Sequence, residues 1–153
     1  TTAAMGLALR ALGHGRRVVV LQFLKDGTSG EIALLRRCCA EVHACPNAKF
    51  TWLMTEAERT EARQHNTAAL RAALDTPFDL LVLDEACAAC RHQLVDEALL
   101  RQAAAMAKQG REVVLTGRDP APWMQEAADY STELRAVRHP YTQGTPAREG
   151  IEY

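Results

Sequence analysis

The chain contains three short, mainly apolar runs, and no other feature of the sequence constrains the fold as strongly. The runs are residues 17–23, 78–83 and 112–116, each rich in valine or leucine. A run without alternation between apolar and polar residues is buried on both faces, which is typical of a central strand in a parallel sheet. Segments of helical composition separate the runs. Strands that alternate with helices predict an α/β fold with a mainly parallel sheet flanked by helices.

The helical segments and the weaker strands complete this pattern. Helices are predicted at 1–12, 31–39, 56–74, 95–108 and 123–128, and weak strands at 41–45 and 129–133. Thr55 and Glu58, three residues apart, form a capping-box motif at the start of the third helix. The first segment has no helix-entry signal before it, so we expect further residues upstream of Thr1. The whole chain, 1–153, is predicted to be one domain.

Composition narrows the classes of function. Of the 153 residues, 48% are hydrophobic and 24% are charged, and the formal net charge is −1. This balance gives no global reason to expect nucleic acid or an anionic membrane as a partner. No apolar run approaches the roughly 20 residues of a membrane span and no signal peptide is recognisable, so the cytoplasm is expected. The five cysteines are an odd number, which favours thiols over a disulfide framework.

Polar residues follow each of the three core runs, at the edge where a parallel sheet binds its ligands. They are Lys25, Asp84–Glu85 and the segment 116–118, which ends in Arg118. Acidic residues after a buried strand hold Mg²⁺ in many nucleotide sites, but Asp84 is equally well interpreted as a helix cap with a solvated Glu85. An arginine after a strand binds phosphate oxygens, although a surface arginine after a turn glycine is the commoner case.

Three other groups of residues have alternative interpretations. The Thr1–Thr2 pair is either the Mg²⁺-binding start of a helix after a phosphate loop or a simple helix cap. Phe50 and Trp52 lie in a loop and either bind a flat ligand or pack onto the core. Two sets of cysteine and histidine residues have the side-chain types found in zinc sites but lack the paired spacing of zinc ligands. We therefore favour a role as small core or pocket-lining residues over a metal site. These sets are Cys87, Cys90 and His92, and Cys38, Cys39, His43 and Cys45.

Taken together, these segments resemble one family. "TTAAMGLALRALGHGRRVVVLQFLK" is similar to the segment that follows the phosphate loop in the P-loop ATP:corrinoid adenosyltransferases. The similarity continues through "FTW" at 50–52, "DLLVLDE" at 79–85, "VVLTGR" at 113–118 and "AADYSTELRAVRHPYTQGTPAREGIEY" at 127–153. Each motif is weak alone, but their common order and spacing over nearly the whole chain make the resemblance specific.

The resemblance implies a RecA-like P-loop fold, a homodimer, and Mg²⁺–ATP and a corrinoid as substrates. The Co(I) form of the corrinoid would attack the 5′ carbon of ATP and release triphosphate, in the biosynthesis or salvage of adenosylcobalamin. A flavin-type reductant and a Gly-Lys-rich loop before Thr1 are further expectations. By position, the resemblance assigns Thr1, Asp84 and Glu85 to Mg²⁺, Thr1, Thr2 and Arg10 to ATP, Glu85 and Arg118 to catalysis, and Phe50 and Trp52 to the corrinoid.

The chemistry of this reaction suits the residues present. Triphosphate is a highly charged leaving group, so cations must be fixed where charge develops. The corrinoid supplies the nucleophile, and no serine or cysteine of triad type is evident. The segment "EACAAC" at 85–90 departs from the family pattern, where larger or polar residues are common. The alternatives are a small-molecule kinase, which would release ADP, and a nucleotide or corrinoid carrier without catalysis, which would release neither product.

Overall fold

The computed structural model describes residues 1–38, 40–45 and 51–152 of the chain. Its centre is a four-stranded, all-parallel sheet with the strand order β2-β1-β3-β4. The strands are β1 (Val18–Gln22), β2 (Glu41–Ala44), β3 (Leu80–Asp84) and β4 (Glu112–Leu115). The two middle strands are buried along their full length. The three apolar runs therefore form adjacent strands, and the predicted parallel α/β architecture is confirmed.

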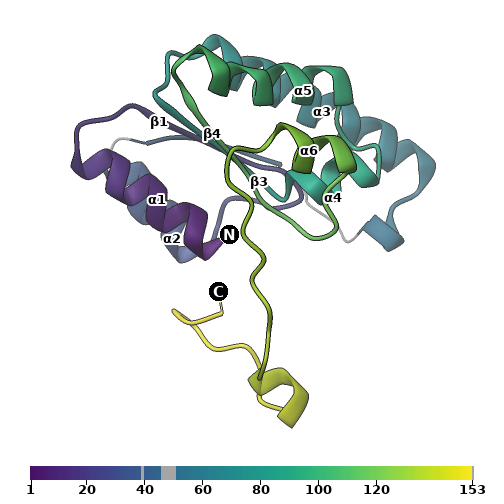
Figure 1. The fold of residues 1–153 in the computed structure, drawn as a ribbon. Coiled ribbons are helices and arrows are strands. Elements are labelled where there is room, and N and C mark those ends of the chain that lie inside the picture. Colours follow the sequence, from purple (N-terminus) through teal and green to yellow (C-terminus); the bar gives the residue numbers. More distant parts are fainter. Residues whose placement is uncertain (39, 46–50, 153) are drawn as a thin grey trace.

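Helices cover both faces of the sheet (Figure 1). The α-helices are α1 (Thr2–Gly13), α2 (Gly30–Arg37), α3 (Glu56–Asp75), α4 (Ala86–Arg91), α5 (Glu97–Ala105) and α6 (Pro122–Ala127). Short 3₁₀ turns in the described residues are η1 (Thr51–Leu53), η2 (Met106–Gln109) and η3 (Pro140–Gln143). Val20 and Val82 point to the face covered by α1 and α2, whereas Leu21 and Leu83 point to the face covered by α3, α4 and α5. This division follows from the two-residue period of a strand.

Local signals explain where several helices begin. At α3 the Thr55 side chain accepts a hydrogen bond from the Glu58 amide, and the Glu58 carboxylate accepts one from the Thr55 amide, which confirms the predicted capping box. At α5 the helix begins two residues later than predicted, because the Asp96 carboxylate caps the amides of Ala98 and Leu99. Val95, which was expected inside the helix, instead lies buried in the core before it.

The weak strand predicted at 129–133 is wrong. Residues 128–139 form no strand, and all of them are exposed. They begin a long C-terminal segment that runs away from the sheet in Figure 1. Its large apolar side chains are exposed: Tyr130, Leu134, Val137, Tyr141 and Ile151. No helix within the described ranges is both long enough and apolar enough to cross a membrane.

Candidate functional site

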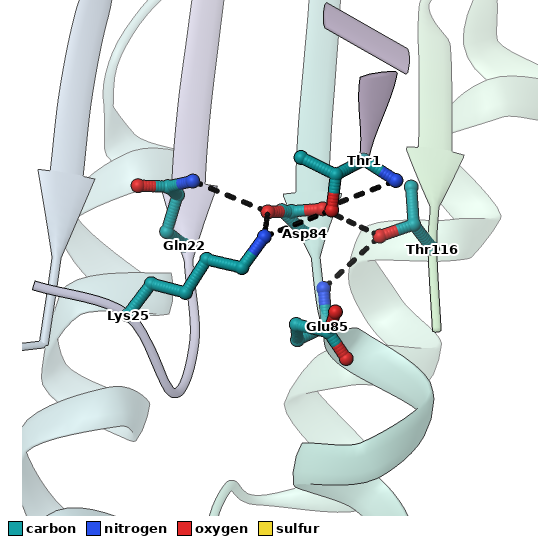
Figure 2. A network of polar contacts seen from close by, with 6 residues as sticks. All are labelled: Thr1, Gln22, Lys25, Asp84, Glu85 and Thr116. Carbon is teal, nitrogen blue, oxygen red and sulfur yellow. Dashed lines mark hydrogen bonds and ion pairs between the residues drawn. The ribbon is translucent and has the colours of Figure 1, made fainter. Parts of the chain in front are cut away.

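A polar network lies at the carboxyl end of the sheet and is centred on Asp84, the last residue of β3 (Figure 2). The Asp84 Oδ2 atom accepts hydrogen bonds from Lys25 Nζ at 2.8 Å and from Gln22 Nε2 at 3.2 Å. Its Oδ1 atom accepts one from the Thr116 hydroxyl at 2.7 Å. These contacts bring together the ends of β1, β3 and β4, as the positions of the polar residues in the sequence predict.

Asp84 is a fully buried carboxylate that stays ionised. Burial alone raises the pKa of Asp84, because a charged group loses its hydration inside a protein. Hydrogen bonds from Lys25 and Thr116, together with the positive charge of Lys25, outweigh this effect and hold the pKa below its ordinary value. A carboxylate of this kind is a fixed negative charge. The interpretation of Asp84 as the helix cap is wrong, because Glu85 occupies the cap position of α4.

Glu85 has an unusual backbone conformation between β3 and α4. Its φ of 61° and ψ of 23° lie in the left-handed region, which non-glycine residues rarely adopt. The Glu85 amide donates a 3.1 Å hydrogen bond to the Thr116 hydroxyl, so the same hydroxyl fixes both acidic residues. Backbone strain of this sort persists where the surroundings enforce it, and it clusters at functional sites. Unlike Asp84, the Glu85 side chain is only half-buried and can reach a ligand.

Two members of the network had no assigned role in the sequence. Lys25 lies at the end of the first core run, but only the structure shows its ammonium group bound to Asp84 and, at 2.8 Å, to the Thr1 hydroxyl. Gln22 is a polar residue inside an apolar strand and sits directly beside Asp84 in the parallel register. It is fully buried, and its Oε1 atom has no hydrogen-bond partner among the described residues. A polar residue near the end of an apolar run was the available signal.

The remaining predicted residues lie at different distances from Asp84. Thr2 is exposed at the start of α1, next to Thr1. Arg118 is exposed two residues beyond Thr116 and makes no hydrogen bond or ion pair within the described ranges. Arg10 lies in the last turn of α1, so the helix carries it away from the network. The structure therefore gathers Thr1, Thr2 and Arg118 near the carboxyl edge and does not bring Arg10 there.

Of the two predicted aromatic residues, Phe50 lies outside the described residues. Trp52 belongs to η1 and is 74% exposed, so it does not pack into the core. The guanidinium of Arg59 donates to the carbonyl oxygen of Thr51 at 3.1 Å and to that of His92 at 3.4 Å. Arg59 therefore ties the turn that carries Trp52 to the end of α4, the helix that begins after Glu85.

Cys87 and Cys90 are buried on α4 as part of the hydrophobic core, which confirms the preferred interpretation of this pair. Burial raises the pKa of both thiols. Gly117 packs against Cys87 so closely that a Cβ atom at this glycine would lie 2.7 Å from the Cys87 Cβ. Together with its φ of 139°, this contact explains why glycine stands between Thr116 and Arg118.

The oxygen atoms at the carboxyl edge are of the type that would suit the magnesium ion implied by the family resemblance. No cluster of three or more His, Cys, Asp or Glu side chains that could hold a metal occurs in the described part of the chain. The edge instead offers hydroxyl and carboxylate oxygens from Thr1, Asp84 and Glu85, which are the hard ligands that Mg²⁺ prefers. A site with so few protein ligands suits Mg²⁺, which commonly takes its other ligands from phosphates and water.

Comparison with known proteins identifies the family. The family model described as ATP:corrinoid adenosyltransferase BtuR/CobO/CobP matches residues 1–153. The chain belongs to this family. It is 38% identical to the corrinoid adenosyltransferase of Pseudomonas aeruginosa over 159 residues, which spans the whole chain and 77% of that relative. It is 36% identical to the corrinoid adenosyltransferase CobA of Salmonella typhimurium and 34% identical to the corrinoid adenosyltransferase of Escherichia coli K12, with 79% of each relative covered.

Membership of the adenosyltransferase family gives the carboxyl-edge network a chemical context. The family acts on ATP and corrinoids. The carboxyl edge of the sheet presents a fixed negative charge at Asp84 and a reachable carboxylate at Glu85, and the exposed guanidinium of Arg118 lies close by in the sequence. In nucleotide-binding proteins generally, groups of these types bind phosphates and their metal ion.

Proposed function

We propose that the chain transfers the 5′-deoxyadenosyl group of ATP to the cobalt of a Co(I) corrinoid, with release of triphosphate, in adenosylcobalamin biosynthesis or salvage. Among the observations on the molecule itself, the Asp84–Glu85 pair at the end of β3 carries the proposal. One carboxylate is buried and fixed, and its neighbour is held in a strained backbone conformation with an accessible side chain. The family supplies the identity of the two substrates.

In this proposal the protein positions groups and does not supply a nucleophile, because the corrinoid provides it. Thr1 and Glu85, with Asp84 behind them, would hold the Mg²⁺ that accompanies ATP. Bound there, Mg²⁺ neutralises charge that builds up on the departing triphosphate. Arg118 is assigned to the phosphate oxygens, because it is exposed at this edge and has no partner in the described ranges.

The aromatic turn is assigned to the corrinoid. An indole that is 74% exposed offers a large, flat apolar surface, and such surfaces bind flat ligands and exclude water from them. We assign Trp52 to the lower face of the corrinoid, together with Phe50. A contact between ATP and Arg10 remains a prediction that the resemblance alone supports.

We further infer a homodimer, a flavin-type reductant for cobalt and a cytoplasmic location, where ATP is available. The exposed apolar side chains of the C-terminal segment support the first inference, since surfaces of this kind mark protein contacts. A reductant is required because the corrinoid attacks in its Co(I) state.

The test is product analysis of the wild-type enzyme and a Glu85→Gln variant. Wild type should form adenosylated corrinoid and triphosphate in equal amounts. The substitution should lower turnover about 100-fold, because a charge near the metal is lost, while the urea midpoint stays unchanged. Glu112→Gln is the matched control, since Glu112 is exposed at the opposite end of the neighbouring strand. Release of ADP would indicate a kinase, absence of both products a carrier, and wild-type turnover in Glu85→Gln would remove Glu85 from the site.

A further inference from the structure

Lys25 is held in place by the backbone on both sides. Leu24 turns the chain directly beyond β1 with a left-handed φ of 40°. The Lys25 carbonyl oxygen then accepts a 2.9 Å hydrogen bond from the Cys45 amide, and the Phe23 amide donates to the Asp84 carbonyl oxygen at 3.0 Å. The Lys25 side chain consequently lies across the carboxyl ends of the strands (Figure 2).

The Lys25 ammonium group occupies the space between two oxygens that are assigned to magnesium. Its Nζ atom lies 2.8 Å from the Thr1 hydroxyl oxygen and 2.8 Å from Asp84 Oδ2. The other Asp84 oxygen accepts a hydrogen bond from Thr116 and lies 3.9 Å from the Thr1 amino group. An ammonium and a divalent cation repel each other and cannot both lie between the same hydroxyl and carboxylate. Lys25 and the metal are therefore alternatives at this position.

The charges around Asp84 differ between the nucleotide-free and the nucleotide-bound enzyme. A fully buried carboxylate without a cation is strongly destabilising, and Lys25 at 2.8 Å is closer to Asp84 than the Thr1 amino group at 3.9 Å. When Mg²⁺ and triphosphate arrive, the metal supplies that positive charge and the phosphates add several negative ones. The lysine side chain has a flexible four-carbon stem and is 32% exposed, so it has room to turn toward solvent and the phosphates.

We propose that Lys25 is an exchangeable counter-ion of Asp84: it takes the place of the metal in the nucleotide-free enzyme and moves to the triphosphate when Mg²⁺–ATP binds. This inference rests on the proposed function for the presence of the triphosphate. It makes Lys25 a second cation for the leaving group, beside Arg118. It also explains why the lysine binds Thr1 and Asp84 at once.

The first measurement uses Mn²⁺ alone, without nucleotide or corrinoid. Lys25→Met keeps most of the length of the side chain and removes its charge. Titration followed by the electron paramagnetic resonance of free Mn²⁺ should show at least about tenfold tighter binding in Lys25→Met than in wild type, since repulsion of the metal is removed. Lys108→Met is the matched control, because Lys108 is exposed on η2, and it should bind Mn²⁺ as wild type does. Equal Mn²⁺ affinity in Lys25→Met and wild type would overturn the exchange.

The second measurement uses inorganic triphosphate with Mg²⁺, followed by calorimetry. Lys25→Met should bind it at least about fivefold more weakly than wild type, because one cation is missing. Undiminished triphosphate affinity would show that Lys25 stays with Asp84 and would refute the movement. If Lys25→Met does not fold, both titrations are repeated with Lys25→Gln, whose neutral amide can still donate a hydrogen bond to Asp84. Neither measurement involves adenosyl transfer, so failure of the proposed function would appear only in the product analysis.

Discussion

Replacing Thr116 by valine preserves the shape of the side chain and removes a single hydroxyl group. That hydroxyl donates to Asp84 Oδ1 at 2.7 Å and accepts from the Glu85 amide at 3.1 Å. The substitution therefore leaves one oxygen of a fully buried carboxylate and one amide without their partners. Valine retains the β-branched form that suits the end of a strand, so packing changes little.

The expected loss of stability follows from these two contacts. A hydrogen bond to a charged group contributes about 1.5–3 kcal/mol, and an amide left without a partner costs about 1–3 kcal/mol when it is buried. The second value is taken at its lower end, because Glu85 is only half-buried and water reaches its surroundings. Asp84 also keeps its bonds from Lys25 and Gln22. The total is about 2–4 kcal/mol, a large share of the 5–15 kcal/mol typical of a domain.

Equilibrium unfolding in urea, followed by circular dichroism at neutral pH, measures this loss. Thr116→Ser is the control, since it keeps the hydroxyl and should lose much less stability than Thr116→Val. Turnover of Thr116→Val should fall as well, because the strained backbone at Glu85 loses its anchor. A valine variant within about 0.5 kcal/mol of wild type, the usual spread for neutral surface changes, would refute the account of the network. Equal losses in the serine and valine variants would refute it too.

Three further predictions concern other parts of the molecule. Trp52→Ala should weaken binding of corrinoid and lower the yield of four-coordinate Co(II) in absorption spectra, while ATP affinity stays near wild type. An unchanged yield would show that the indole does not contact the corrinoid. Gly117→Ala should destabilise the protein by about 2–4 kcal/mol in urea unfolding, since the new methyl group meets Cys87 and the backbone is strained; a neutral substitution would contradict the close packing. Hydrogen bonds from Arg17 hold the pKa of Asp79 well below its ordinary value. This pair therefore stabilises the fold above the unfolded-state pKa of about 4, and its contribution is lost as the pH falls further. The difference in urea midpoint between wild type and Asp79→Asn should shrink from pH 6 to pH 2.5, and a constant difference would contradict the prediction.

The sheet and the location of the site were predictable because both depend on simple patterns. Continuous apolar runs marked the three strands that are now adjacent, and their polar ends had to meet at one edge. Asp84 and Thr116 were found in this way. The capping box at Thr55 was equally direct, because its two residues interact over three positions of sequence.

Other features depend on tertiary contacts that no local pattern records. The left-handed conformation of Glu85 is enforced by Thr116 from another strand, and the role of Lys25 exists only beside Asp84. The prediction of a strand at 129–133 was wrong for a related reason. Its residues have an extended pattern but pair with no strand in the described part of the chain, and an isolated strand has no partners for its backbone groups.

The Asp84 network also bears on the order in which the chain folds. Its hydrogen bonds join positions at least 24 residues apart, and Gln22 and Asp84 are separated by 62. Contacts so distant along the chain form only after long loops close, and burying the carboxylate before its partners arrive is unfavourable. We therefore expect Thr116→Val to accelerate unfolding far more than it slows refolding in stopped-flow experiments. The network that receives the nucleotide would then be among the last parts to assemble, so nucleotide binding would distinguish finished chains from unfinished ones.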